Sequence, residues 1–171
     1  MPVDFGGSVV SSDELRSRLD QFSQILGRDI RVLRGDMSSA PPVPPAGAPA
    51  PAQKPGCLGS LFGAKPAPAP DPRILEGRTA GEQGHARGVA ADIVVDGLTT
   101  REVSEAAARS GLFDGVGHYE VAADVPAHTH VDVAGRGGPG GDARLWLVGA
   151  AGATLGWAAL DSLYRRRDSD S

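Results

Sequence analysis

Apolar side chains recur at helical spacing near the N-terminus and then alternate with polar ones. The helical repeat consists of Leu15, Leu19, Phe22 and Leu26. Ser11 and Glu14 have the spacing of a capping box, so we expect the helix to begin there. Gly27 is placed to end it. Residues 29–33 alternate polar and apolar side chains, which predicts a strand.

The second half of the chain combines short apolar stretches with one more amphipathic segment. Thr99 and Glu102 again have capping-box spacing, and Gly111 is placed to close the helix that they begin. Four stretches have the character of strands: 92–95, 115–121, 129–134 and 143–148. This pattern predicts an α+β fold with a small antiparallel sheet and flanking helices.

Composition changes sharply between residues 39 and 72, where eleven of the 34 residues are proline and most others are alanine or glycine. Such a segment cannot bury a core, so we interpret 39–72 as a flexible insertion. It separates an N-terminal helix and strand (1–38) from a core (73–148), which a C-terminal Gly/Ala segment with a polar tail follows (149–171). We interpret a short apolar segment around Cys57 as a patch within the linker. The alternatives are an acylation site and a docking peptide.

Bulk properties argue against several classes of function. A net charge of −4 and an aromatic content of 5% give no basis for nucleic-acid binding. The single cysteine allows neither an intrachain disulfide nor a cysteine-based zinc site. The N-terminus lacks the pattern of a signal peptide. The most apolar stretch, 145–160, is shorter than the ~20 residues of a membrane span, so we expect no membrane partner.

The first chemistry-bearing motif runs from residue 84 to residue 92. Gly84 and Gly88 favour a loop that leads into the strand beginning at Asp92. His85 would then fold back beside that carboxylate.

The second motif covers residues 128–133. In a strand, His128 and His130 project from the same face because they are two residues apart. Two imidazoles and a carboxylate leave one tetrahedral position open, which is the arrangement of catalytic rather than structural zinc sites.

Together, His85-x-x-Gly88-x-Ala90-x-Asp92 and His128-x-His130 resemble the zinc signature of the D-Ala-D-Ala carboxypeptidase-like peptidases. That family shares its fold with lysostaphin-type enzymes and the hedgehog signalling domain. The resemblance covers about 73–146, and it also includes the stretch 115–119 and a late Arg144-x-Trp146. It implies a hedgehog/DD-peptidase-like fold.

The resemblance also implies roles for individual residues. His85, Asp92 and His130 are the implied zinc ligands, and His128 is implied to lie beside the metal without binding it. There it could hydrogen-bond the attacking water or the developing oxyanion.

Three carboxylates are candidates for the general base. Asp124 lies six residues before His130, which resembles the hedgehog pattern, and Glu120 is its rival. Asp132 shares the phase of His130, although a fold-stabilising hydrogen-bond acceptor is its favoured role. For His118 we favour a place in the core or in the surroundings of the ligands.

The chain departs from the family pattern after its first strand. The family usually carries a Ser-Gly-Tyr-Arg-like motif there, and its arginine helps to bind substrate. Residues 33–38 stand in its place, and Arg34 is the candidate substitute. This departure affects endopeptidase activity less than carboxypeptidase activity.

The expected function is a zinc-dependent peptidase that cleaves peptide stems or crosslinks of bacterial peptidoglycan. The alternative is a non-catalytic zinc-binding module of the same fold that binds cell wall or a protein partner. Without a signal peptide, the protein would be made in the cytoplasm and reach the wall by a non-classical route. The Pro/Ala segment 39–72 would then suit a delivery or scaffold partner.

Overall fold

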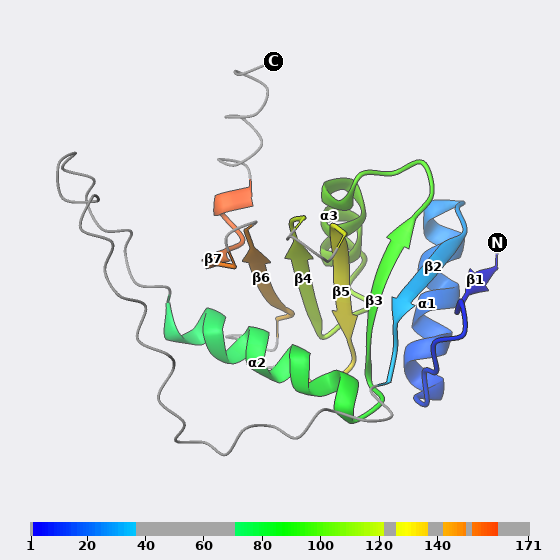
Figure 1. Ribbon diagram of the computed structural model, residues 1–171, viewed down its shortest axis with the longest axis horizontal. Coiled ribbons are helices and arrows are strands. Elements are labelled where there is room, and N and C mark those ends of the chain that lie inside the picture. The colour runs from blue at the N-terminus through cyan, green and yellow to red at the C-terminus, as the bar shows by residue number, and fades with distance from the viewer. Residues whose placement is uncertain (1, 37–70, 122–125, 137–141, 150–151, 161–171) are drawn as a thin grey trace, which may run out of the picture. The chain divides into compact units, whose positions relative to one another are not determined.

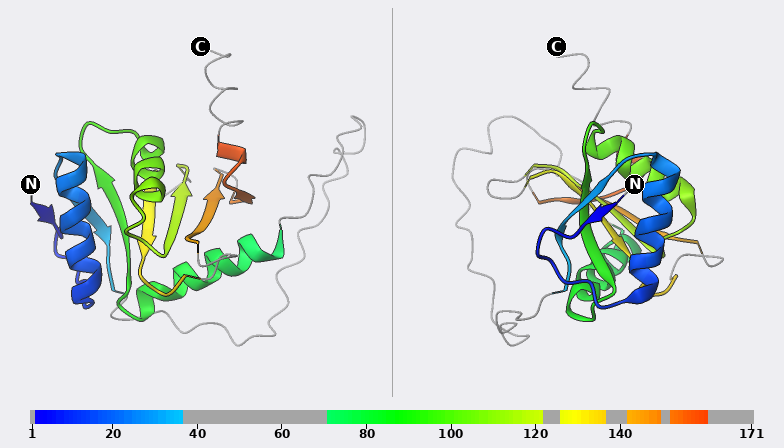
Figure 2. Two further views of the ribbon diagram at one scale, coloured as in Figure 1. Left: turned by 180° about the vertical axis from the view of Figure 1, so that it is seen from behind. Right: turned by 90° about the vertical axis from the view of Figure 1, so that its right-hand side faces the viewer.

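The computed structural model places most of the chain in a sheet covered by helices on both faces (Figure 1). The described residues are 2–36, 71–121, 126–136, 142–149 and 152–160. Helices α1 and α3 lie on one face of the sheet and α2 lies on the other (Figure 2). The expected mixture of helices and strands is therefore confirmed.

Seven strands form the sheet, in the order β1-β2-β3-β5-β4-β6-β7. Their bounds are β1 Val3–Asp4, β2 Ile30–Arg34, β3 Ala90–Val95, β4 Gly115–Tyr119, β5 His128–Asp132, β6 Arg144–Val148 and β7 Thr154–Gly156. The pairs β1–β2 and β4–β6 are parallel and the other pairs are antiparallel. The sheet is thus larger than the small antiparallel one expected, and it is mixed. Hydrophobic patterns locate strands but do not say which neighbour each one pairs with.

Helix α1 (Asp13–Leu26) begins one residue later than the predicted capping box. Ser12 is the N-cap, and its side chain accepts a hydrogen bond from the Leu15 amide. The predicted box of Ser11 and Glu14 is wrong, because Ser11 bonds the Asp36 carboxylate instead. Gly27 ends the helix in the left-handed conformation, as expected.

Helix α3 (Thr100–Ser110) follows its prediction closely. Thr99 and Glu102 form a complete capping box, in which each side chain bonds the backbone N–H of the other residue. Gly111 closes the helix with a positive φ.

The main apolar core lies between the sheet and the pair α1 and α3. Phe22 of α1 meets Phe113 edge to face at 5.4 Å between ring centroids. The buried residues of this core include Leu15, Leu19, Ile30, Val32, Ile93, Val103, Val116 and Val131. Because side chains alternate along a strand, the residues between these positions point to the face covered by α2.

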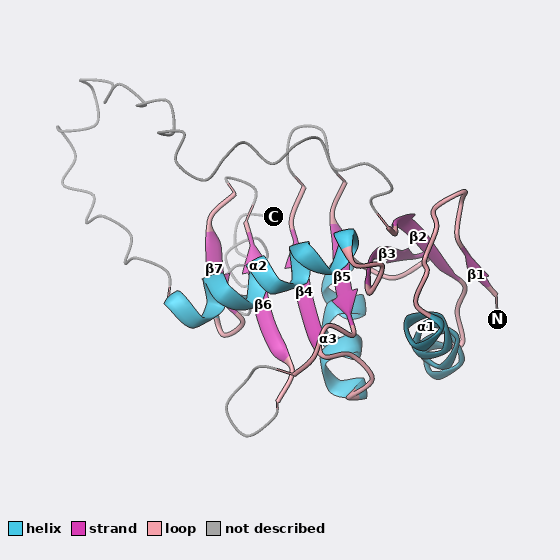
Figure 3. Ribbon diagram, turned by 90° about the horizontal axis from the view of Figure 1, so that it is seen from below, coloured by secondary structure: helices cyan, strands magenta, loops and turns pink. Residues whose placement is uncertain are grey.

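Helix α2 (Pro72–Ala86) was not predicted as a helix. Asp71 caps it by accepting a hydrogen bond from the Arg73 amide, and Pro72 occupies its first position. The helix runs across the strands from β7 to β3 (Figure 3). Its start falls within the end of the predicted 39–72 insertion. Residues 37–70, including Cys57, lie outside the described part of the chain.

Part of the C-terminal segment 149–171 belongs to the sheet. β7 pairs with β6 through Leu155 and Leu147, next to Gly156 and Trp146. No helix among the described residues is both long and apolar enough to cross a membrane.

Candidate metal centre

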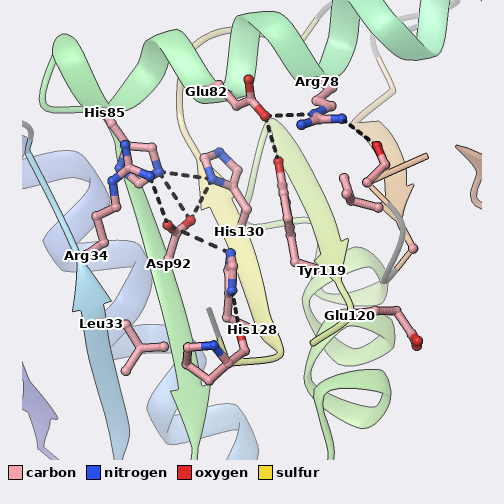
Figure 4. A pocket seen from close by; sticks show the side chains of 14 residues that line it. Leu33, Arg34, Arg78, Glu82, His85, Asp92, Tyr119, Glu120, His128 and His130 are labelled. Carbon is pink, nitrogen blue, oxygen red and sulfur yellow. Dashed lines mark hydrogen bonds and ion pairs between the residues drawn. The ribbon is translucent and has the colours of Figure 1, made fainter. Parts of the chain in front are cut away.

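Strand pairing brings two of the predicted ligands side by side. Asp92 of β3 and His130 of β5 are direct partners in the antiparallel register. Both side chains point to the face that α2 covers, and His128, two residues before His130 in β5, lies on the same face (Figure 4).

The third predicted ligand, His85, comes from the last turn of α2. The expectation that Gly84 and Gly88 make this region a loop is therefore wrong for His85. A Cβ on Gly84 would lie 2.8 Å from the Ala90 Cβ, and one on Gly81 would lie 2.5 Å from the Trp146 ring. The glycines let the helix approach the sheet closely enough for His85 to reach Asp92.

The three side chains converge on a common point (Figure 4). The Asp92 Oδ1 atom lies 2.9 Å from His130 Nδ1 and 3.2 Å from His85 Nε2, and the two nitrogens lie 3.2 Å apart. Ligand atoms around a tetrahedral zinc with bonds of ~2.0–2.1 Å would be about 3.3 Å apart. The residues His85, Asp92 and His130 are 2%, 6% and 1% exposed. This buried group could hold a metal ion.

Outer partners fix which ring nitrogen of each ligand histidine faces the cluster. His85 Nδ1 lies 2.8 Å from the Gly35 carbonyl oxygen, which only accepts, so Nδ1 carries the hydrogen. The lone pair of neutral His85 is then on Nε2, inside the cluster. His130 Nε2 faces the Asp132 Oδ2 atom at 3.6 Å, while Nδ1 points to Asp92.

Charges within the cluster shift two pKa values in opposite directions. Burial alone would raise the pKa of Asp92, but hydrogen bonds and charges from His130 and His85 outweigh it and hold that pKa far below 3.8. Burial alone would lower the pKa of His130, but Asp132 and Asp92 outweigh it and raise that pKa to about 9. The raised pKa favours the protonated form of His130 when no metal is bound, with a hydrogen on the Nδ1 atom that a cation would contact.

His128 lies beside the three converging residues. Its Nδ1 donates a hydrogen bond to the Pro126 carbonyl at 2.8 Å, and its Nε2 lies 3.9 Å from Asp92 Oδ2. The ring stacks on Tyr119 with centroids 4.7 Å apart and an interplanar angle of 13°. His128 therefore presents Nε2 to the cluster with its ring plane held in place.

A pocket of about 660 Å³ opens over the cluster. Arg34 lines it with a half-exposed side chain, and its guanidinium lies 4.0 Å from Asp92 Oδ2. The sequence-based choice of Arg34 as a substrate-binding candidate thus falls on the pocket wall. The other lining residues include Leu33, Arg78, Glu82, Tyr119, Pro126 and Val148.

Three polar lining residues that interact with one another, Arg78, Glu82 and Tyr119, were not among the site residues predicted from the sequence. Glu82 Oε1 lies 2.7 Å from Arg78 Nε and accepts a longer hydrogen bond, 3.4 Å, from the Tyr119 hydroxyl. That hydroxyl also accepts from Trp146 Nε1 at 3.2 Å. Arg78 and Glu82 lie on the side of α2 that also carries His85, so a helical reading of residues 72–86 would have placed them beside the predicted ligand.

The candidates for a general base are placed differently from one another. Glu120 pairs with His118 at 3.5 Å, and His118 Nδ1 lies 3.2 Å from Ser104 of α3. In Figure 4 the Glu120 carboxylate points away from the converging histidines. Asp132 is buried and bonds the Ala134 amide and Arg144, which agrees with a fold-stabilising acceptor. Asp124 lies outside the described residues.

No protein-family model matches this chain, and no curated protein or solved structure shows a significant match to it.

Proposed function

We propose that this protein is a zinc-dependent peptidase. The observation that carries the proposal is the buried convergence of His85, Asp92 and His130 at a pocket, with His128 beside them. The hedgehog/DD-peptidase-like fold implied by the sequence resemblance is part of the same proposal.

Zinc is the proposed metal because of the donor set. Two imidazole nitrogens and one carboxylate oxygen at tetrahedral spacing suit Zn²⁺, whereas Mg²⁺ and Ca²⁺ prefer oxygen ligands. When bound in such a site, zinc supplies a Lewis acid and a water that ionises near neutral pH.

His128 is the residue proposed to move the proton. Because the Pro126 carbonyl holds the hydrogen on Nδ1, Nε2 is free to take a proton from the attacking water. The resulting imidazolium can stabilise the oxyanion and then return the proton to the leaving amine. The stacked Tyr119 ring restricts the imidazole to one plane during these transfers.

The proposed substrate is a peptide stem or crosslink of bacterial peptidoglycan, a choice that rests on the sequence resemblance. The pocket, about 660 Å³, has room for several amino-acid residues. Arg34, which lines the pocket, is the proposed partner for a carboxylate of the substrate. Endopeptidase cleavage is favoured because the family's usual substrate-binding motif is replaced.

Mass spectrometry of purified peptidoglycan fragments tests the proposal. The zinc-loaded protein is expected to generate new peptide products that disappear with a chelator and with His85→Ala. His118→Gln, a histidine change on the opposite face of the sheet, is the matched control and should keep the products. Zinc-loaded protein that leaves several wall types unchanged would instead support the non-catalytic zinc-binding module.

A further inference from the structure

We propose that Asp132 and Arg144 form a buried positioning pair that holds His130 with Nε2–H outward and Nδ1 toward the metal. The proposal rests on the metal-binding part of the proposed function and not on peptide cleavage. In this proposal the Asp132–Arg144 pair raises the affinity of the site for a divalent metal ion.

The contacts around Asp132 give its two oxygens different tasks. Oδ1 accepts hydrogen bonds from Arg144 Nη2 and from the Ala134 amide. Oδ2 faces His130 Nε2 at 3.6 Å, and neither of these buried atoms has a hydrogen-bond partner within the described part of the chain. Hydrogen bonds thus fix Oδ1 in place, while Oδ2 is directed at His130 Nε2.

Arg144 is itself fixed by its surroundings. Its side chain is only 9% exposed, and Nη1 donates to the Gly77 carbonyl of α2 at 3.4 Å. Asp132 is fully buried. Moving either charge into a new position would therefore leave the other buried without its partner, which is costly.

Gly115 provides the space that the carboxylate occupies. A Cβ at this position would lie 2.1 Å from Asp132 Oδ2 and 2.9 Å from its Cγ. Gly115 is the direct strand partner of Asp132 across β4 and β5. A side chain here would displace the oxygen that faces His130.

The Asp132→Asn variant separates hydrogen-bond direction from side-chain size. The donors of Arg144 and Ala134 require the amide oxygen at the Oδ1 position, so the NH₂ group must face His130 Nε2. A donor there favours a lone pair on Nε2 and a hydrogen on Nδ1. That tautomer blocks the nitrogen that must bind the metal.

Zinc affinity measured by competition with a chromogenic chelator is the first readout. Loss of such an outer carboxylate typically costs about 10- to 100-fold in metal affinity, and we expect that loss for Asp132→Asn. Asp96→Asn removes the same charge from an exposed side chain and should leave the affinity unchanged. Gly115→Ala should weaken zinc binding without any change of charge.

Nuclear magnetic resonance of the histidine ring nitrogens in the wild-type zinc-loaded protein is the second readout. We expect His130 to be bound through Nδ1 with a protected Nε2–H, and His85 to be bound through Nε2. This measurement keeps the proposal testable if Asp132→Asn does not fold.

Zinc bound with wild-type affinity in folded Asp132→Asn, or His130 bound through Nε2, would overturn the positioning role and leave the peptidase proposal intact. Failure of the wild-type protein to bind zinc would overturn both.

Discussion

His85 Nε2 and His130 Nδ1 face each other at 3.2 Å although 45 residues separate them in the chain. The two histidines use opposite ring nitrogens because their outer partners differ. The Gly35 carbonyl takes the Nδ1–H of His85, and the Asp132 carboxylate faces Nε2 of His130. Both inner nitrogens are therefore directed at the position beside Asp92 where a cation would bind.

Turnover should depend on His128 and not on Glu120. His128→Gln removes the imidazole nitrogen that this residue presents to the cluster, and we expect kcat to fall about 10²- to 10⁴-fold. Zinc affinity should change little. Glu120→Gln should keep most of the activity, because this carboxylate pairs with His118. Cleavage of a peptidoglycan fragment, followed by mass spectrometry, measures both variants.

Asp124→Asn is the rival variant for this assignment, since the family resemblance implies a base at or near that position. If Asp124→Asn abolishes turnover while His128→Gln retains it, the proposed proton transfer through His128 is wrong.

Much of the metal site could be predicted from the sequence because its residues belong to short motifs. Strand periodicity put His128 and His130 on one face, and the structure has them there. Asp92 was placed at a strand start and lies within β3. These predictions rely only on the alternation of side chains along a strand, and residue spacing in the sequence is enough to apply that rule.

Helix α2 was missed because its sequence carries weak helical signals. Gly77, Gly81 and Gly84 are poor helix formers, and they replace the large apolar residues that usually mark a buried helix face. In the structure these glycines are the buried face. The helix is held by close approach to the sheet, a tertiary effect that local patterns do not record.

The hydrophobic pattern of the sequence also could not predict which strands pair with each other. The parallel pairing of β4 with β6 sets Gly117 against Trp146, where a Cβ would lie 2.5 Å from the indole ring. A glycine inside a strand signals a close approach but does not name its partner. The sheet order therefore required the three-dimensional structure.

Adding a methyl group to Gly81 should disturb the metal site, whereas adding one to Gly77 should not. The new Cβ of Gly81→Ala would lie 2.5 Å from the Trp146 ring and 3.1 Å from His130 Nε2. We expect a loss of about 1–3 kcal/mol in the free energy of unfolding, with weaker zinc binding.

Gly77→Ala is the matched control, because its Cβ would meet Arg144 at an ordinary 3.5 Å. It should be neutral or stabilising by up to about 1 kcal/mol, as alanine is the better helix former. Urea unfolding and chelator competition test both variants. Equal stability and equal zinc affinity in the two would contradict the close approach of α2.

Loss of the α3 cap should destabilise the fold without affecting the metal site. Thr99→Ala removes the side chain that accepts from the Glu102 amide, and we expect a cost of about 1 kcal/mol. α3 packs on the face opposite to α2, so zinc affinity should be unchanged. A parallel fall in zinc affinity, measured where the variant is fully folded, would show coupling across the sheet.

Stability of the metal-free protein should depend on pH through His130 and Asp92. Asp132 and Asp92 raise the His130 pKa to about 9, so its contribution is full below 6.5 and is lost as pH rises through 9. The lowered pKa of Asp92 gives a contribution that is present above 3.8 and is lost as pH falls further. Thermal unfolding should therefore show the highest midpoint at about pH 4–6.5.

Zinc binding should release the proton from His130, because the ion and the proton compete for Nδ1. Between pH 6 and pH 8, below the His130 pKa of about 9, zinc affinity should rise about tenfold per pH unit. Calorimetry in buffers of different ionisation enthalpy measures the released protons directly, and one is expected near pH 7. His128→Gln should release the same number, since that ring is not a ligand. A zinc affinity independent of pH, with no proton released, would show that His130 is neutral in the metal-free protein. The prediction that zinc displaces a proton from Nδ1 would then be wrong.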